Sequence, residues 1–268
     1  MLLIDIKQCL FFLKKFNKNY NKINTLILGS SHARQSIVEE SQILNVGLGS
    51  QDLYYSWQLY VKYNMFLPKL KNVVVFYSIF SPGNDIQRSP LYERSAVYKI
   101  LLDIPYKNTI LAFEQKLNIL EENIITDYLP EAFKNPLSLD VNYTGVNTQK
   151  NCLTEQQIDN FIESWLKLNK AETKQNHFLQ YILNAAQNNS QNVLIVLSPY
   201  RNDVRAKLPN SHDLYSDLLI LTSRYNNIEI LNAYEDEEFV PDDFLDSDHL
   251  NYQGACKLTA KIREKLSL

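Results

Sequence analysis

The sequence predicts a three-layer α/β fold, in which a doubly wound sheet of five parallel strands lies between helices. Five short apolar runs alternate with segments of helical character, and this alternation is typical of parallel sheets built from βαβ units. One run, residues 72–78, is almost continuously apolar, as expected of a strand that is buried on both faces. Right-handed crossovers and the chain order favour the flavodoxin-like strand order 2-1-3-4-5.

The length and composition fit one globular unit. The chain has 268 residues, enough for one large domain that carries an insertion, and we predict a single domain over residues 1–268. Its formal net charge of −3 gives no electrostatic argument for nucleic-acid binding. Cys9, Cys152 and Cys256 are far apart and form no C-x-x-C pair. They fit free thiols in a reducing compartment, so we expect a cytoplasmic protein.

The N-terminal segment, residues 1–15, is predicted to form an amphipathic first helix. It is too short to span a membrane, Asp5 and Lys7 interrupt its apolar character, and no small-residue cleavage site follows it. Peripheral contact with a membrane through this helix is the alternative interpretation. A basic and polar linker is expected from Lys14 to Asn24.

The sheet and its helices follow in order. Strands are expected at residues 25–28, from residue 43, and at 72–78, 192–197 and 228–231. Helices are expected at residues 33–40, 52–63, 211–224 and 252–265. Between the third and fourth strands the pattern is mixed over residues 86–190, which is far longer than an ordinary connection. We interpret this stretch as a mostly helical insertion that caps the carboxyl edge of the sheet and ends in a helix near residues 174–187.

Polar residues follow the strands where each strand ends. Ser30 and Ser31 follow the first strand, Gly49-Ser50 the second, Gly83-Asn84-Asp85 the third, and His249 lies beyond the fifth. Ligands of doubly wound sheets bind outside the carboxyl ends of the strands. The convergence of these groups at one edge therefore predicts an active site, although serines at such a turn can also serve only as helix caps.

A serine nucleophile needs a base, and His249 is the favoured one of four histidines. Asp246 lies three residues before it, a spacing that lets a carboxylate hold the imidazole while its other nitrogen faces outward. His177 fits a solvated helix position and His212 a helix start. His32 follows Ser31 on the same turn, where its side chain is expected to point away.

The alternative for residues 242–249 is an ordinary Asp-rich loop that caps a helix. The acidic residues also suggest a divalent metal, but their spacing matches no metal motif. We therefore predict neither a metal nor a cofactor.

Taken together, these segments resemble the four sequence blocks of the SGNH hydrolases, also called GDSL-type esterases. The matching segments are Gly29-Ser30-Ser31, Asn45-x-Gly47-x-Gly49-Ser50, Gly83-Asn84-Asp85 and Asp246-x-x-His249. The resemblance covers the sheet, about two thirds of the chain, and not the insertion. It implies that Ser31 is the nucleophile, His249 the general base and Asp246 its orienting acid.

The resemblance further implies an oxyanion hole made by the backbone N–H of Ser31, a backbone N–H near Gly49 and Ser50, and the side-chain amide of Asn84. Two departures from the family pattern concern this hole. Ser50 stands where the second block has its glycine, and the third block reads Pro82-Gly83-Asn84-Asp85 instead of Gly-x-Asn-Asp. Ser81 is the possible substitute for Asn84.

The implied activity is acyl-ester chemistry through a seryl acyl-enzyme, as an esterase or a transferase. An O-acetylated carbohydrate, such as a bacterial surface polysaccharide, is the favoured substrate, because no long apolar run suggests a lipid tunnel and the insertion is rich in aromatic residues: Tyr92, Tyr98, Tyr106, Tyr128, Tyr143 and Trp165. The alternatives are a non-catalytic glycan-binding or scaffold domain of the same fold and a lipid-directed esterase or thioesterase.

Overall fold

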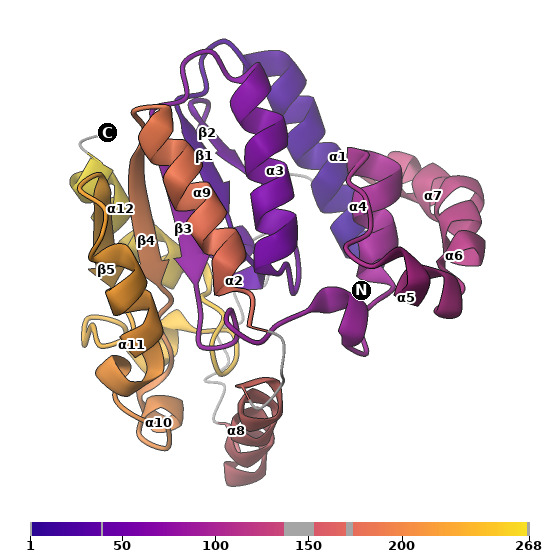
Figure 1. The fold of residues 1–268 in the computed structure, drawn as a ribbon. Coiled ribbons are helices and arrows are strands. Elements are labelled where there is room, and N and C mark those ends of the chain that lie inside the picture. The colour runs from indigo at the N-terminus through magenta and orange to yellow at the C-terminus, as the bar shows by residue number, and fades with distance from the viewer. Residues whose placement is uncertain (1, 39, 137–152, 170–173, 267–268) are drawn as a thin grey trace.

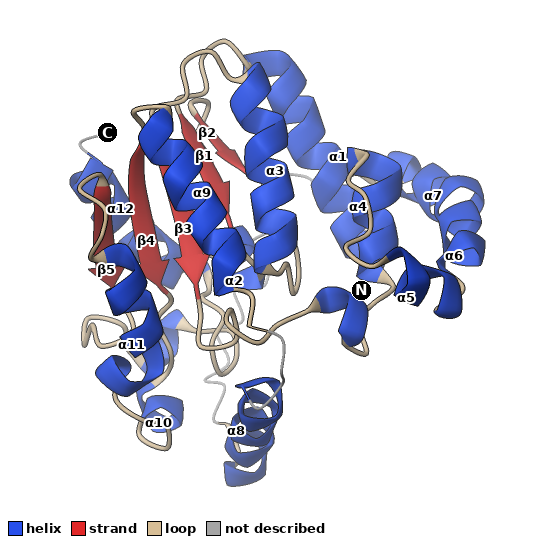
Figure 2. Ribbon diagram, in the orientation of Figure 1, coloured by secondary structure: helices blue, strands red, loops and turns tan. Residues whose placement is uncertain are grey.

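The computed structural model describes residues 2–38, 40–136, 153–169 and 174–266. Its centre is a sheet of five parallel strands: β1 (Thr25–Leu28), β2 (Ile43–Asn45), β3 (Asn72–Tyr77), β4 (Asn192–Leu197) and β5 (Ile228–Asn232). Their order is β2-β1-β3-β4-β5, and pairs such as Leu26–Val73 and Val75–Ile195 fix the register of the central strands. The predicted fold class and strand order are therefore confirmed (Figures 1 and 2).

Helices cover both faces of the sheet, because successive side chains of a strand point to opposite faces. Leu26 and Leu28 of β1 belong to one buried cluster and Ile27 to the other. The first cluster holds side chains of α1 (Leu2–Asn19), α3 (Leu53–Phe66), α9 (Asn176–Asn188) and α11 (Ser211–Thr222). The second holds side chains from α2 (Ser31–Gln35) and α12 (Tyr252–Leu266).

Two helix predictions need correction at their ends. The first helix continues to Asn19, so the first part of the expected linker is helical; no glycine or proline interrupts it there. The helix after Ser31 ends at Gln35 instead of continuing to residue 40. The Thr259 hydroxyl accepts the Val38 N–H at 3.0 Å, so this backbone group is bound to α12 and not to a longer helix.

The insertion is largely helical where it is described. It contains η1 (Ile86–Arg88), α4 (Arg94–Leu102), α5 (Thr109–Glu114), α6 (Leu117–Asn123), η2 (Ile124–Tyr128), α7 (Leu129–Lys134) and α8 (Glu155–Asn169). α4 and α7 pack against α1 at the side of the sheet, whereas α8 lies below its carboxyl ends (Figure 1). Among the described helices of the insertion between η1 and α8, α8 is the one that stands where we expected the whole insertion to form a cap. Tyr143 and Cys152 lie outside the described residues.

The remaining short helices are α10 (Asn202–Arg205), after β4, and η4 (Pro241–Asp243), in the loop before α12. Among the described residues, no helix combines the length and the apolar composition that crossing a bilayer requires.

Candidate active site

Ser31 stands where β1 turns into α2. Gly29 has a φ of +140°, and a Cβ there would lie 2.7 Å from Phe76 Cβ, so this tight turn requires glycine. Ser30 is the N-cap residue, and its hydroxyl accepts the His32 N–H at 3.4 Å. The helix-cap interpretation therefore applies to Ser30. Ser31 is the first residue of the helix, and its hydroxyl points to another part of the chain.

That hydroxyl meets His249, which is 218 positions away along the chain. Ser31 Oγ lies 2.7 Å from His249 Nε2, and His249 Nδ1 lies 2.8 Å from Asp246 Oδ2. Asp246 Oδ1 also accepts the backbone N–H groups of Asp248 and His249, at 3.1 and 2.9 Å. These bonds hold the loop in a tight turn that points the imidazole at Ser31. The three residues of the predicted triad thus form one continuous chain of contacts.

The surroundings of His249 favour its protonated form. Burial alone would lower its pKa, but the carboxylates of Asp248 and Asp246 outweigh burial and raise the pKa above its usual value. Asp248 itself is buried, which would raise its pKa, yet the neighbouring His249 and His32 hold that pKa well below the usual range. A base in this setting can accept a proton from a hydroxyl without leaving an unpaired charge.

The predicted oxyanion donors lie on three loops, and the structure separates their roles. Asn84 donates one amide hydrogen to the Ser50 carbonyl at 2.9 Å, which leaves its second amide hydrogen available. Gly49 N–H is directed at Asp5 Oδ1, 3.4 Å away. Ser81 Oγ accepts the Ser78 N–H at 2.9 Å, so Ser81 serves its own turn. The structure therefore favours Asn84 over Ser81.

Two backbone donors remain. Ser31 begins α2, so its N–H has no acceptor within the helix. Ser50 has a φ of +55°, the left-handed conformation that favours glycine. Ser50 therefore adopts a backbone conformation that glycine adopts more readily than serine does. In the described part of the chain, the Ser50 N–H makes no hydrogen bond.

A buried ionic cluster supports this loop, and sequence analysis missed it. Asp5 of α1 lies 3.2 Å from Arg34 Nη1 and 3.3 Å from Arg94 Nε. Arg94 approaches so closely that a Cβ on Gly49 would lie 1.9 Å from its Nη1. The cluster therefore joins α1, the end of α2, the Gly49-Ser50 loop and α4. Nothing in the sequence pattern around Asp5 indicates a partner, because its two arginines are 29 and 89 positions away.

Asp52 joins the second and third loops. It caps α3 by accepting the Tyr55 N–H at 2.9 Å, and its other oxygen accepts the Ile86 N–H at 3.0 Å. Burial raises the pKa of this carboxyl to about 6. Since Ile86 lies two residues after Asn84, this one carboxyl helps to fix the position of the Asn84 amide.

The other histidines divide as follows. His177 on α9 and His212 on α11 are exposed. His32 is buried and turned away from Ser31, as expected, but it faces Asp248: its Nε2 lies 3.2 Å from Asp248 Oδ2. Asp248 and His32 are thus additional residues at the site, and their sequence positions beside His249 and Ser31 are the only signal that could have found them.

Asp246, Asp248 and His249 bring ligand-type atoms within 4.8 Å of one another. Each group, however, already has a protein partner: His249 bonds to Asp246, and Asp248 contacts His32 and Ser247. We therefore assign these groups to one another. The expectation of no metal and no cofactor stays a prediction.

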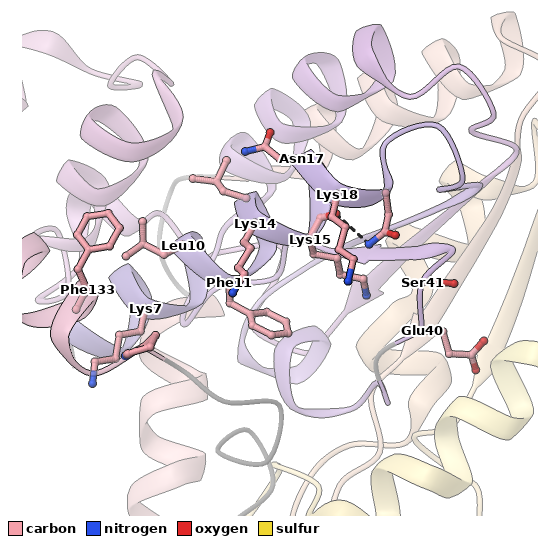
Figure 3. Close-up of a pocket in the computed structure, with 14 residues that line it drawn as sticks. Lys7, Leu10, Phe11, Lys14, Lys15, Asn17, Lys18, Glu40, Ser41 and Phe133 are labelled. Atoms are coloured by element: carbon pink, nitrogen blue, oxygen red, sulfur yellow. Dashed lines mark hydrogen bonds between the residues drawn. The ribbon is translucent and has the colours of Figure 1, made fainter.

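A large groove lies away from this site. It encloses about 930 Å³ between α1, α7 and the loop at Glu40 and Ser41, and no residue of the predicted triad lines it (Figure 3). Its walls combine lysines with apolar side chains. It therefore bears on interactions of the chain rather than on the chemistry at Ser31.

Comparisons with known proteins add little. No protein-family model and no curated protein matches the chain. Among solved structures, one provisionally described as a platelet activating factor from Streptococcus pneumonia is similar, with a TM-score of 0.49 and 10% sequence identity over 99% of this chain and 94% of that chain. A similarity of this size carries no argument about activity.

Proposed function

We propose that the protein is a serine-dependent acyl-ester hydrolase or acyltransferase of the SGNH type. The observation that carries the proposal is the 2.7 Å contact between Ser31 Oγ and His249 Nε2, with Asp246 hydrogen-bonded to the opposite nitrogen of the same ring. A hydroxyl, a base and an orienting carboxylate in this order are what activation of a serine requires.

The reaction then follows from the geometry. His249 takes the Ser31 proton as the serine oxygen bonds to the acyl carbon. The ester C–O bond breaks, and the leaving alcohol takes that proton from His249. Water or an acceptor hydroxyl next attacks the acyl-serine, with His249 again taking and returning one proton. Negative charge on the carbonyl oxygen would meet the Ser31 and Ser50 N–H groups and the Asn84 amide, and each donor is worth roughly 3 kcal/mol in such a site.

For the substrate we propose a short acyl group on a carbohydrate. The segments that follow β1, β2 and β3 carry polar residues, namely Ser30, Ser50 and Asn84, and polar groups suit a hydroxyl-rich substrate better than a lipid tail. The aromatic residues of the insertion do not support this choice as expected. Tyr98 is buried and stacks on Tyr55 at 3.9 Å, and the described others are partly buried against the core.

The alternatives have weaker support. A scaffold that lost its chemistry has no need to keep a hydroxyl at 2.7 Å from an oriented imidazole. A lipid-directed enzyme would need an apolar pocket at Ser31, and the groove of Figure 3 is lined by no residue of the predicted triad.

The test is acetate release from p-nitrophenyl acetate by wild type and Ser31→Ala, with and without sugar acceptors. We expect wild-type release and a loss of about 10⁴-fold or more in Ser31→Ala, with unchanged thermal stability. Acetylated sugar detected by mass spectrometry would assign a transferase. The proposal fails if a fluorophosphonate probe does not label Ser31 and release is the same in both proteins.

A further inference from the structure

A second imidazole–carboxylate pair lies directly behind the first. His32 Nδ1 lies 3.0 Å from Ser30 Oγ, and His32 Nε2 lies 3.2 Å from Asp248 Oδ2, an ion-pair contact rather than an aligned hydrogen bond. The His32 ring stacks on that of His249, with centroids 5.3 Å apart. The structure thus contains two serine–histidine–aspartate series side by side. One is Ser31, His249 and Asp246, and the other is Ser30, His32 and Asp248, which begins at the preceding serine.

The two carboxylates near His249 differ in exposure. Asp246 makes the hydrogen bond, but its side chain is 50% exposed, whereas the side chain of Asp248 is 10% exposed and its Oδ1 lies 3.5 Å from the same Nδ1. Water screens a charge at the surface far more than a buried one. The buried carboxylate therefore acts more strongly on the ring charge, although it lies farther away.

The tautomer of His32 follows from its partners. Ser30 Oγ accepts the His32 backbone N–H and lies 3.0 Å from Nδ1, where a hydroxyl can donate or accept. The Asp248 carboxylate can only accept, so we assign the ring proton to Nε2, the nitrogen that faces it. Ser247 Oγ donates to Asp248 Oδ1 at 2.9 Å. His32 and Ser247 together fix the orientation of this carboxylate.

We propose that Asp248 is the positioning residue that stabilises the charged form of His249, an assignment that rests on the proposed function. In this assignment His32 holds Asp248 in place, and Asp246 mainly orients the His249 ring. The charged groups that act on His249 are Asp246 and Asp248 from its own loop, and Arg34 from α2, whose positive charge opposes protonation. The assignment therefore predicts a different effect for each of the two acids.

The test measures the pKa of His249 by NMR titration of the histidine Cε1–H signals in a Ser31→Ala background, where no turnover is needed. The chain has four histidines, so His249→Gln assigns the signal. We expect Asp248→Asn to lower this pKa by about one unit or more, and Asp246→Asn to lower it less. Asp213→Asn, an exposed acid on α11, is the matched control and should leave it unchanged.

A larger shift in Asp246→Asn than in Asp248→Asn would overturn the assignment, whether or not the protein proves to be an esterase. If Asp248→Asn does not fold, His32 gives a second route. Gln at position 32 keeps a donor toward Asp248, and Ala does not. In an active enzyme we expect His32→Ala to lower kcat about tenfold with KM unchanged, and His32→Gln to restore it. Equal kcat values in both variants would remove His32 from the assignment.

A different observation concerns the outer face of α1. Lys7, Phe11, Lys14, Lys15 and Lys18 recur at intervals of three and four residues, which places them on one side of the helix. All five line the groove of Figure 3. The opposite side of α1, with Ile6, Cys9 and Phe12, is buried in the core. We call the exposed side the lysine face.

The lysine face carries a positive charge within a chain of net charge −3. The only acid in α1 is Asp5, which is buried and ion-paired with Arg34 and Arg94. Glu40 also lines the groove, but it lies 3.0 Å from Arg263. Beside the lysines, Phe133 of α7 is 68% exposed. Lysines beside an exposed aromatic side chain fit the headgroup boundary of a membrane.

We infer that the lysine face docks on an anionic lipid bilayer, with α1 lying along the surface. The partner is chosen by charge complementarity: a negative surface attracts this side of the molecule, and a zwitterionic one does not. The inference does not depend on the chemistry at Ser31, because the groove shares no residue with the predicted triad.

The test is co-sedimentation with vesicles of phosphatidylcholine alone or with about one third phosphatidylglycerol. We expect binding only to the anionic vesicles, decreasing with salt, and lost in Lys7→Gln/Lys14→Gln/Lys18→Gln. A triple variant with the same charge change at exposed lysines elsewhere, Lys167→Gln/Lys174→Gln/Lys265→Gln, should bind like wild type. Equal loss in both triple variants, or no binding by wild type, would overturn the inference. So would a dimer in solution that only the first variant disperses, because the face would then bind a second copy.

Discussion

Asp52→Asn tests how the oxyanion loops are held, because Asp52 links the cap of α3 to the backbone at Ile86. Its carboxyl is 2% exposed, and burial raises its pKa from 3.8 to about 6. The carboxyl ionises near pH 3.8 in the unfolded chain and only near pH 6 in the folded one. The contribution of the Asp52 carboxyl to the free energy of unfolding of the wild type is therefore highest at low pH, and it decreases as the pH rises from about 4 to 6.

The size of the effect follows from the shift. About two pKa units correspond to roughly 3 kcal/mol, of which about 2 kcal/mol falls between pH 4.5 and 7.5. Asparagine does not titrate. The pH-dependent contributions of all other titratable groups to the free energy of unfolding cancel when variant and wild type are compared at the same pH. The difference in the free energy of unfolding, wild type minus Asp52→Asn, should therefore be about 2 kcal/mol larger at pH 4.5 than at pH 7.5.

The assay is urea denaturation followed by tryptophan fluorescence and circular dichroism at several pH values. Asparagine also removes one of the two acceptors for the Tyr55 and Ile86 N–H groups, which costs about 1–3 kcal/mol at every pH. This constant offset does not affect the comparison. A wild-type-minus-variant difference that stays the same from pH 4.5 to 7.5, within about 0.5 kcal/mol, would refute the reasoning.

Three further predictions concern the site. His249→Ala should lower kcat by about 10⁴-fold or more without loss of thermal stability. Asp246→Asn should lower kcat less, because the asparagine retains part of the turn around His249. Equal activity of Asp246→Asn and wild type would remove Asp246 from the predicted triad. Gly49→Ala should displace Arg94 and disturb its buried pairing with Asp5, which costs about 3 kcal/mol or more and lowers Tm, as calorimetry can check; an unchanged Tm would show that Arg94 moves freely. The acid limb of kcat/KM should lie above pH 6.5, since the pKa of His249 is raised, and a limb below that value would show that another group is the base.

The sequence by itself determined the sheet and the location of the candidate site. Apolar runs and turn residues are local signals, so all five strands lie within a residue or two of their expected bounds, and their order follows from the rules for parallel connections. The convergence of Ser31, Asn84 and His249 at one edge follows from the same topology. Helix ends were predicted less accurately than strands. The end of α2, for example, depends on a hydrogen bond from Val38 to Thr259, which is 221 positions away.

Only the tertiary structure decided which group does what. The resemblance to a known family pointed to Ser31, but only packing against the loop at His249 shows that the Ser31 hydroxyl faces this imidazole while the Ser30 hydroxyl caps the helix. The Gly49 N–H is directed at Asp5 of α1, 44 positions earlier in the chain, and Asp248 is buried where Asp246 is not. Such assignments depend on distance and burial, which arise when segments far apart in sequence pack together, and no local pattern of residues records them.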